Sequence, residues 1–470
     1  MTDRKRFQKI RTAARTATGR GGRSWLYREL AKELFHHEVS RSRDYRYLAK
    51  ILRGKARAAA ENRQRVMSEI WDGRTILESN PIAIDYIGTF SGCNMRPPCP
   101  KCFAPPPTAI RYAWDGNLYR GLEGFLATAS NLQEGTQGEI LMLRHFEELV
   151  EATGQDRPRL SIVTNGTLMD SSKIEAMVGQ INAICISLDA PHPEGYAKLQ
   201  GRPEQFEQVV QSIRELVAKR NASGSRFPLI QFGYTFCNEN AGDFMDFCRL
   251  AADIGMDRVV AITLLGVEGL KIRKSRPQKR KEFRFVYSEQ VPSEEDAYRM
   301  VQRAKREFED SGMTVWTDID QIAVTMCIND AELDVMEGPT CATPWTCFVP
   351  TPGGTTSHCV WGGGYEVGNW REQGPRGVWN GDEMRQIRED MLRFGIARPC
   401  LMSQYCPLTR RVRMFAEMSG KGYLLEEAIT DWSEAPLLLP FIKKAIENTA
   451  RARAWVMRNG KRVRLSDIDS

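Results

Sequence analysis

Between Pro81 and about residue 270, short apolar runs typical of strands alternate with amphipathic helical stretches. The apolar runs are Ile82 to Ile87, Leu160 to Val163, Ala183 to Leu188, Leu229 to Phe236 and Val259 to Leu265. The helical stretches are Leu143 to Ala152, Glu204 to Lys219 and Ala241 to Ile254. Strands at this spacing with helices between them form βαβ units, whose strands are parallel. The segment 79–270 is therefore predicted to be an α/β core built on a parallel sheet or barrel.

The segments on either side of this core differ from it in composition. Residues 1–78 are predicted to be a helical arm, and the first 70 of them hold 19 Lys and Arg against 7 Asp and Glu, so the chain's net charge of +7 originates there. Residues 271–336 begin with a basic run and continue into a helix. Residues 337–412 are rich in Gly, Pro, Thr, Trp and Cys, as in a small module held by more than its core. Residues 413–470 are predicted to be C-terminal helices and a basic tail.

Hydropathy excludes a membrane-spanning helix. The chain has 470 residues and a mean hydropathy of -0.42, and its apolar runs are far shorter than the ~18 residues that span a bilayer. No apolar signal segment follows the first residues, and we expect a cytoplasmic protein. Basic runs are more often solvated faces than phosphate sites, and no RRM, zinc-finger or KH motif is present. Nucleic acid is therefore not expected as a partner.

The cysteines gather in two clusters. Because thiols stay reduced in a cytoplasmic protein, a cysteine cluster indicates metal binding or catalysis before it indicates disulfides. Cys93, Cys99 and Cys102 form the first cluster, directly after the first predicted strand. Three thiolates leave one coordination position open, which suits either zinc with a bound water or an iron–sulfur cluster with one open iron. The spacing alone supports both.

Four motifs at the ends of the predicted strands resemble, in their order, those of the radical S-adenosylmethionine (SAM) superfamily. They are the cysteine triad, Gln137-Gly138-Glu139-Ile140-Leu141 before a helix, Thr164-Asn165-Gly166-Thr167, and Ser187-Leu188-Asp189. Gly-Glu and Ser-Leu-Asp are weak signals individually, so the resemblance depends on order, spacing and position at strand ends. It covers roughly residues 80–270. The alternative is a zinc-binding α/β protein.

The resemblance implies a partial (β/α)6 TIM-like barrel whose 4Fe-4S cluster is bound by Cys93, Cys99 and Cys102, with SAM at the fourth iron. The residues implied to contact SAM are Gly138, Glu139, Thr164, Asn165, Ser187 and Asp189. The implied chemistry is a 5′-deoxyadenosyl radical that removes hydrogen from an unactivated carbon. Such a site fits the rule that barrel chemistry lies at the carboxyl ends of the strands.

Three details depart from the family pattern. The spacing is Cys-x5-Cys-x2-Cys, whereas Cys-x3-Cys-x2-Cys is usual. Lys101 stands where an aromatic residue is usual, and Phe103 follows the last cysteine instead. The Gly-Glu segment has Gln137 for its second glycine and Ile140 for proline. Three prolines stiffen the longer cysteine loop, and we interpret it as a variant of the same site.

The second cysteine cluster resembles the opening of SPASM and twitch modules, which carry auxiliary iron–sulfur clusters. Cys341 is followed by twelve residues, Gly354, four residues and Cys359, and Cys400-x5-Cys406 resembles a later part of the pattern. Gly368-Asn369-Trp370 and Val378-Trp379-Asn380 resemble its connecting segments, whereas the usual Cys-x2-Cys and final cysteine are missing. One auxiliary 4Fe-4S cluster is implied, with a structural zinc site as the alternative. Its implied ligands are Cys341, Cys359, Cys400 and Cys406, with Cys347 as a substitute.

The resemblance implies a SAM-dependent radical enzyme, an oxidoreductase or epimerase, that takes electrons from a flavodoxin or ferredoxin. We favour a small polar metabolite as its substrate, such as a sugar, an aminoglycoside or a nucleotide-linked sugar. The arm lacks the strand alternation of the winged-helix element that recognises peptides. The alternatives are modification of a ribosomal peptide or protein by cross-linking, epimerisation or oxidation, and a non-enzymatic metal protein that binds nucleic acid.

Among the isolated cysteines, Cys237 is the candidate catalytic residue. It lies just past the carboxyl end of the predicted strand Leu229 to Phe236, where a thiol can return hydrogen to a substrate radical. Cys185, inside a strand, and Cys248, on a helix, are expected to be packing residues. The five histidines share no helical face or ligand spacing, so we expect surface or core roles for them.

Overall fold

The computed structural model describes residues 43–86, 91–95, 99, 118–134, 137–156, 159–237, 239–263, 294–317, 338–360, 365–403, 406–447 and 454–468. The basic arm before residue 43, the basic run that begins at Lys271 and the third cysteine of the first cluster, Cys102, lie outside these residues.

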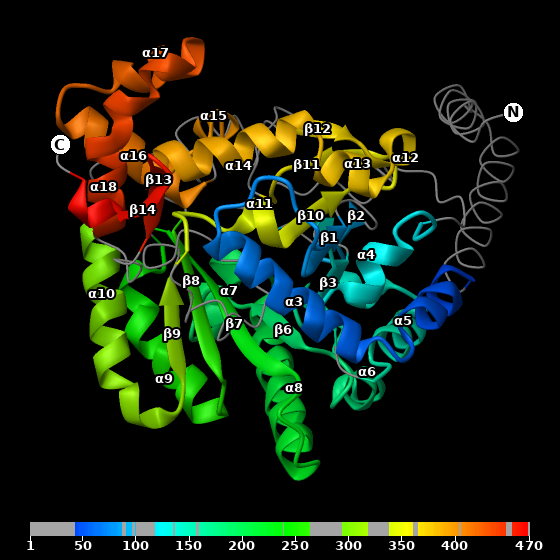
Figure 1. Ribbon diagram of the computed structural model, residues 1–470. Helices are drawn as coiled ribbons and strands as arrows, with labels where there is room; N and C mark the ends of the chain where they lie inside the picture. Colours follow the sequence, from blue (N-terminus) through cyan, green and yellow to red (C-terminus); the bar gives the residue numbers. More distant parts are fainter. Residues whose placement is uncertain are drawn as a thin grey trace, which may run out of the picture.

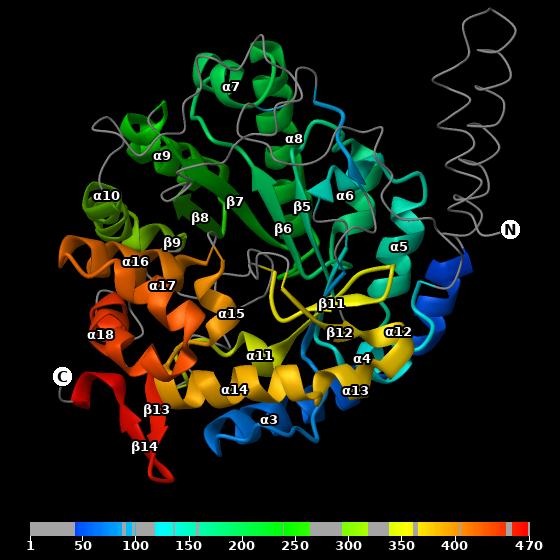
Figure 2. The same cartoon turned by 90° about the horizontal axis from the view of Figure 1, so that it is seen from above.

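Within the described residues, one sheet of ten strands organises the chain, in the order β12-β11-β10-β1-β3-β5-β6-β7-β8-β9 (Figures 1 and 2). Seven of its strands form a parallel series: β1 (Ala83–Tyr86), β3 (Asn131–Glu134), β5 (Leu160–Thr164), β6 (Ala183–Ser187), β7 (Leu229–Phe236), β8 (Arg258–Thr263) and β9 (Thr314–Thr317). The order ends at β12 and β9, so the sheet is open. The predicted α/β class with a parallel sheet is confirmed, and an open parallel series is consistent with a partial barrel.

Helices cover one face of this sheet (Figures 1 and 2). They are α5 (Phe146–Thr153), α6 (Ser171–Met177), α7 (Pro193–Leu199), α8 (Pro203–Ala222), α9 (Phe244–Ile254) and α10 (Glu294–Glu307). Local signals set their ends. The Asp170 side chain accepts the Lys173 N–H at the start of α6, Pro203 begins α8, and α9 stops at Gly255, whose φ of +85° suits glycine.

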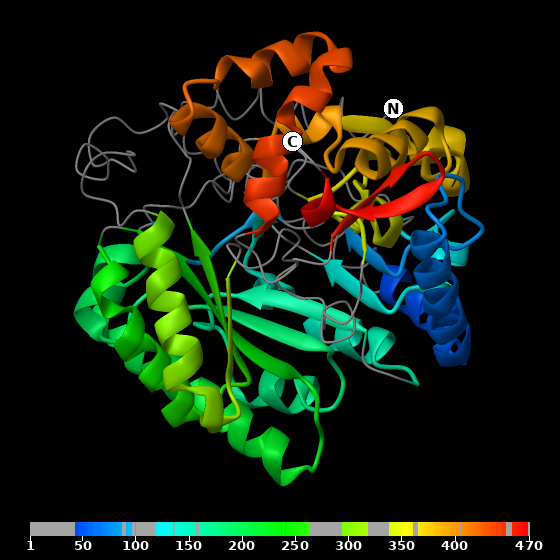
Figure 3. The ribbon, with the colours of Figure 1, turned by 60° about the vertical axis from the view of Figure 1, so that its left-hand side comes forward.

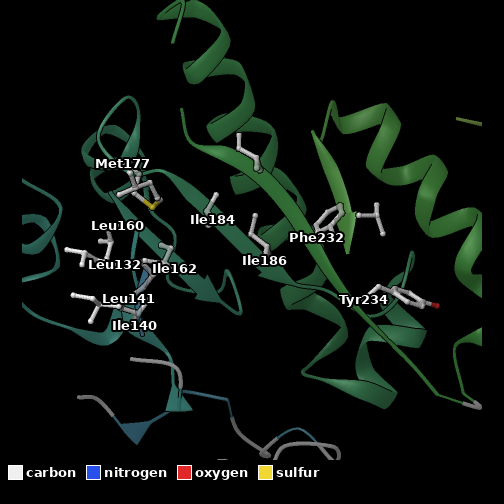
Figure 4. Close-up of a cluster of buried hydrophobic side chains, with 14 of the residues drawn as sticks. Leu132, Ile140, Leu141, Leu160, Ile162, Met177, Ile184, Ile186, Phe232 and Tyr234 are labelled. Carbon is white, nitrogen blue, oxygen red and sulfur yellow. The ribbon is translucent and has the colours of Figure 1, made fainter. Parts of the chain in front are cut away.

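The face of the sheet under these helices is apolar (Figure 4). The buried strand residues on it include Ile84, Leu132, Leu160, Ile162, Ile184, Ile186, Phe232 and Tyr234. Burial of each such side chain contributes on the order of 2 kcal/mol. This face supplies most of the core. Its apolar side chains explain why these strands could be recognised in the sequence as apolar runs.

The opposite, inner face of the same strands carries polar residues. Side chains alternate between faces along a strand, so the register that pairs Ile84 with Leu132 also pairs Asp85 with Gln133. Farther across the sheet, Cys185 pairs with Gln231 and Gln231 with Arg258. We did not predict β3 from the sequence, because half of its residues face this polar side.

The cysteine-rich segment continues the core sheet. Its strand β10 (Cys347–Pro350) pairs in parallel with β1, with Ala83 opposite Cys347. The strands β11 (Thr355–Ser357) and β12 (Glu366–Asn369) then extend the sheet antiparallel. We expected a small module held by more than its core, whereas the segment shares the core sheet and buries Trp345, Trp370 and Trp379.

Residues 74–80, here called the strap, join α3 (Ala56–Trp71) to β1. Two guanidinium groups of the C-terminal half hold the strap by its backbone. Arg376 donates to the carbonyls of Leu77 and Ser79 at 3.1 and 2.8 Å, and Arg388, on α14 (Asp382–Phe394), donates to that of Thr75 at 2.9 Å. The start of β1 is therefore fixed from the C-terminal half.

The C-terminal region contains α15 (Arg398–Leu401), α16 (Pro407–Met418), α17 (Tyr423–Thr430) and α18 (Leu439–Glu447). Figures 1 and 3 show α16 to α18 on the same side of the molecule as α14, away from α8. The stretch expected as a basic tail forms a hairpin of β13 (Trp455–Arg458) and β14 (Lys461–Arg464). Asn459 and Gly460 both have positive φ, as a two-residue hairpin turn requires. None of the helices in the described parts of the chain is long and apolar enough to cross a bilayer.

Asp85 gives a prediction about pH. Its side chain is 5% exposed, and burial raises the pKa of its carboxyl from 3.8 to about 7. Because the pKa is higher in the folded than in the unfolded state, stability is lost as pH rises from about 4 to about 7. Asp85→Asn should therefore increase the free energy of unfolding at about pH 8 by up to about 4 kcal/mol, and much less at about pH 4. Urea unfolding of both proteins at the two pH values measures this. An equal difference at both would contradict it.

Candidate functional site

The cysteine loop begins beside the Gly-Glu segment. The short strand β2 (Ser91–Gly92) pairs in parallel with β4 (Gln137–Gly138), so Gly92 lies opposite Gly138. The Glu139 N–H also donates to the Gly92 carbonyl at 2.7 Å. Cys93 is the next residue, and the structure therefore places the first cysteine next to the predicted Gly138-Glu139 segment.

Glu139 connects this segment to the end of β5. Its carboxylate accepts hydrogen bonds from the Leu141 N–H at 3.0 Å, the Thr164 hydroxyl at 2.6 Å and the Asn165 N–H at 2.7 Å. Burial raises the pKa of Glu139, and these three donors partly oppose the rise. Since the carboxylate is occupied in this way, the side chain positions the loop, and the backbone of the segment is left for contact with a ligand.

Asn165 links the end of β5 to the cysteine loop. Its side-chain amide donates to Cys93 Sγ at 3.5 Å and to Asn94 Oδ1 at 2.9 Å. The Met95 N–H lies 3.5 Å from the same sulfur. Two N–H donors therefore point at one thiol, and such donors stabilise negative charge on a metal-bound thiolate.

Gln200 links the second cysteine to the end of β6. The Cys99 thiol donates to the Gln200 carbonyl at 3.4 Å. The Gln200 side chain donates to the Ser187 carbonyl at 2.7 Å and accepts from the Asp189 N–H at 3.0 Å. The predicted Ser187 and Asp189 thus belong to one network with Cys99. Gln200 belongs to no motif, and no sequence signal identified it.

Tyr196, on α7, is a second residue that the sequence did not identify. Its hydroxyl is buried and has no hydrogen-bond partner among the described residues. Burial raises its pKa, with further contributions from Cys99, Asp189 and Cys93, so the hydroxyl lies close to both thiols. A Cβ on Gly201 would lie only 2.7 Å from the Tyr196 ring, so only glycine allows this packing.

The donor set fits an iron–sulfur cluster. Cys93 and Cys99 are half-buried thiols outside any disulfide, and amide donors surround the first of them. Thiolates with N–H donors to sulfur are the usual surroundings of such clusters. Cys102 lies outside the described residues, and within the described ones no group of three or more His, Cys, Asp or Glu forms a ready metal site.

In the second cluster, Cys400, on α15, lies near two other thiols. Burial raises its pKa well above the usual value, and the neighbouring Cys406 and Cys341 raise it further. Cys406 is the residue before α16, and the Cys341 thiol donates to the Thr343 hydroxyl at 3.3 Å. Three of the four implied auxiliary ligands are therefore close enough to interact electrostatically, although within the described residues they do not form a ready metal site.

The turn after β11 brings His358 to the second cluster. His358 Nε2 lies 4.0 Å from Cys400 Sγ, and burial lowers the pKa of this histidine to about 4. We expected a surface or core role, and it is a core residue whose contact with Cys400 the sequence did not reveal. The loop needs Gly354, whose φ is +99° and whose Cβ would lie 2.2 Å from the side chain of Asn369.

Cys347 occupies a different environment. It begins β10, is 3% exposed and packs with Ala83, Val349 and Val360. Burial raises its pKa well above the usual value, as do the nearby Asp85 and Cys341. The side chain is therefore part of the sheet packing, unlike that of Cys400.

Cys237 directly follows β7, as predicted. Its N–H donates to Asn240 Oδ1 at 2.8 Å, and the Asn240 side chain also donates to the Asp189 carbonyl at 2.9 Å. The thiol-bearing turn is therefore joined to the end of β6. Cys185 and Cys248 are buried, and burial raises the pKa of each to about 12, as for packing residues.

The chain was compared with known proteins. The Radical SAM superfamily matches residues 87–251. No curated protein matches the chain. Among solved structures, SuiB of Streptococcus suis bound to S-adenosylmethionine is 15% identical, with 73% of this chain and 75% of that chain covered and a TM-score of 0.45. Native anSMEcpe with bound AdoMet is 16% identical, with 78% of this chain and 99% of that chain covered and a TM-score of 0.47. TM-scores this low support no inference about activity.

The family match spans the loop of the first cysteine cluster and the ends of β5, β6 and β7, where the network of Cys93, Glu139, Asn165 and Asp189 lies. The cofactors of that family are SAM and a 4Fe-4S cluster, which fit the thiols found here. Residues 87–251 are therefore a domain of the radical SAM superfamily.

Proposed function

We propose that this radical SAM enzyme oxidises or epimerises a small polar metabolite at an unactivated carbon, with Cys93, Cys99 and Cys102 as ligands of its SAM-binding cluster. One observation carries the proposal: hydrogen bonds connect two of these thiols to the ends of β5 and β6. Asn165 contacts Cys93, and Gln200 connects Cys99 to Asp189. Cofactor and substrate sites in parallel α/β proteins lie at such strand ends.

When bound, the cluster and SAM supply a carbon radical that removes a hydrogen atom from the substrate. The chain's own residues prepare the site for it. The amide groups of Asn165 and Met95 hold Cys93 by its sulfur, and the backbone of Gly138 and Glu139 is presented beside that loop. We propose SAM contacts from Gly138, Glu139, Thr164, Asn165, Ser187 and Asp189.

The secondary structure of the N-terminal arm bears on the substrate class. Residues 43–52 and 56–71 are helical, and the described part of the arm contains no strand. A winged peptide-recognition element needs strands, so a small metabolite remains the better proposal. A ribosomal peptide or protein is the alternative, which the resemblance to SPASM modules implies.

We further propose one auxiliary 4Fe-4S cluster on Cys341, Cys359, Cys400 and Cys406. The proximity of three of these thiols supports it. We also propose, from the sequence, a cytoplasmic location and a flavodoxin or ferredoxin as electron donor. The predicted boundaries between segments of the chain, after residues 78, 270, 336 and 412, likewise remain proposals.

Alanine substitution of each first-cluster cysteine tests the SAM-binding site. Cys93→Ala, Cys99→Ala and Cys102→Ala should each abolish formation of 5′-deoxyadenosine from SAM under dithionite, because a cluster with three thiolates has no spare ligand. About four of the roughly eight iron atoms per chain should remain in each variant. Cys248→Ala, which alters a buried thiol of α9, is the matched control and should retain activity. Stoichiometric zinc without sulfide in the wild type would contradict the assignment.

The auxiliary ligands are tested by iron analysis after anaerobic reconstitution. Cys341→Ala, Cys359→Ala, Cys400→Ala and Cys406→Ala should each lose about four iron atoms per chain. Cys347→Ala should lose fewer, because Cys347 packs within the sheet. If Cys347→Ala loses as much iron as Cys341→Ala, Cys347 is a ligand and our assignment is wrong.

Cys237 is tested as a hydrogen donor to the substrate radical. In deuterated water, Cys237→Ala should still form 5′-deoxyadenosine but lose the product that carries a solvent-derived deuterium, because the thiol exchanges its hydrogen with solvent. Mass spectrometry of the product measures the deuterium. An unchanged product would eliminate Cys237 as the donor and favour oxidation through the auxiliary cluster.

A further inference from the structure

Asp85 is a buried carboxylate on the inner face of the sheet. It lies in β1, the strand that leads into the cysteine loop, and its neighbour Ile84 packs in the apolar core on the other face. Its register partner on β3 is Gln133, and Cys347 of β10 is close enough for Asp85 to raise the pKa of its thiol. The carboxylate is therefore at the centre of the sheet and on the side that carries polar residues.

Within the described residues, one oxygen of this carboxylate lacks a hydrogen-bond donor. The side chain is 5% exposed, and its Oδ1 has no hydrogen bond among the described residues. Burial raises the pKa of its carboxyl, and no positive group among the described residues opposes the rise. The neighbouring Glu139 shows the contrast, because three donors satisfy its buried carboxylate.

A buried carboxylate without a partner destabilises a protein by about several kcal/mol. We therefore expect a bound ligand to pair with this carboxylate. A hydroxyl or amide donor would satisfy the oxygen but leave the negative charge uncompensated. A protonated amine would satisfy both, as close charge pairs do in interfaces. The environment therefore selects a cationic nitrogen over a neutral donor.

We propose that Asp85 binds a protonated amine of the substrate and that the substrate is an amino sugar or a similarly small polar amine. This inference rests on the proposed function and narrows its substrate class. Asp85 then acts as the residue that determines specificity, on the strand that leads into the cysteine loop.

Isothermal titration of the anaerobic holoenzyme tests the proposal, with SAM present and no reductant. The probe is neamine, an amino sugar, and its fully N-acetylated derivative has the same rings without the positive charges. The wild type should bind neamine and not the derivative. Asp85→Asn keeps the size of the side chain and removes its charge, and it should weaken neamine binding about thirtyfold or more. The affinity for SAM should be the same in both proteins.

The matched control is Asp253→Asn, which alters an exposed carboxylate of α9 that pairs with Arg214. It should leave the affinity for neamine unchanged. Equal binding of neamine by wild type and Asp85→Asn, equal binding of the acetylated derivative, or no binding by the wild type overturns the proposal. Binding of acetyl-Gly-Lys-Gly-amide that depends on Asp85, without binding of neamine, also overturns it and assigns the carboxylate to a peptide.

A different measurement tests the proposed function, namely cleavage of SAM under dithionite. The proposed function fails if the wild type does not cleave SAM under dithionite, whatever neamine does in the titration. Failure of the Asp85 proposal leaves that cleavage intact, because the hydrogen bonds that hold Cys93 and Cys99 in the described part of the chain do not involve Asp85. The two assays therefore separate the two conclusions.

Discussion

The pairing of β1 with β10 is the constraint on which the rest of the structure depends. It joins the first strand of the barrel to the cysteine-rich segment, with Ala83 opposite Cys347. The strap strengthens this junction, because Arg388 is buried and donates to the backbone carbonyls of Thr75 in the strap and of Pro344 in α11 (Thr343–Thr346). Burial lowers the pKa of Arg388 to about 9, so these carbonyls compensate a costly charge. Hydrogen bonds to a charged group contribute about 1.5–3 kcal/mol each.

This junction matters because β1 leads directly to Cys93. The position of the cysteine loop is then fixed from two sides, by β1 and by the pairing of Gly92 with Gly138. The two faces of the sheet divide the remaining tasks. Apolar side chains under the helices stabilise the fold, and polar side chains such as Asp85 and Gln231 lie on the opposite face. Alternate residues of the same strands therefore have different environments.

The strands with long apolar runs could be predicted from the sequence, and the limits of β7, Leu229–Phe236, agree with the prediction. The strand β3 could not be predicted, because Asn131 and Gln133 face the polar side and interrupt the apolar run that marks the other strands. The hairpin of β13 and β14 was missed although Asn459-Gly460 is a turn signal.

The motifs at the ends of the strands could be recognised because each of them is local in sequence. The contacts of Tyr196, Gln200 and His358 could not be predicted, because the cysteines that these residues approach are distant from them in sequence. The sequence also did not identify Asp85 as a candidate site residue, because one acidic residue in a short apolar run indicates only the end of a strand. A role for Asp85 depends on the side chains that surround it in the fold.

The pairing of β1 with β10 also bears on how the protein is made. Ribosomes synthesise on the order of 5–20 residues per second, and almost the whole barrel is translated between these two strands. During those tens of seconds, one edge of β1 has no neighbour, and an unpaired edge is where nascent chains join one another. A charged residue that points inward discourages such association. Asp85 lies in β1 and faces inward, so its charge would oppose such association until β10 is made.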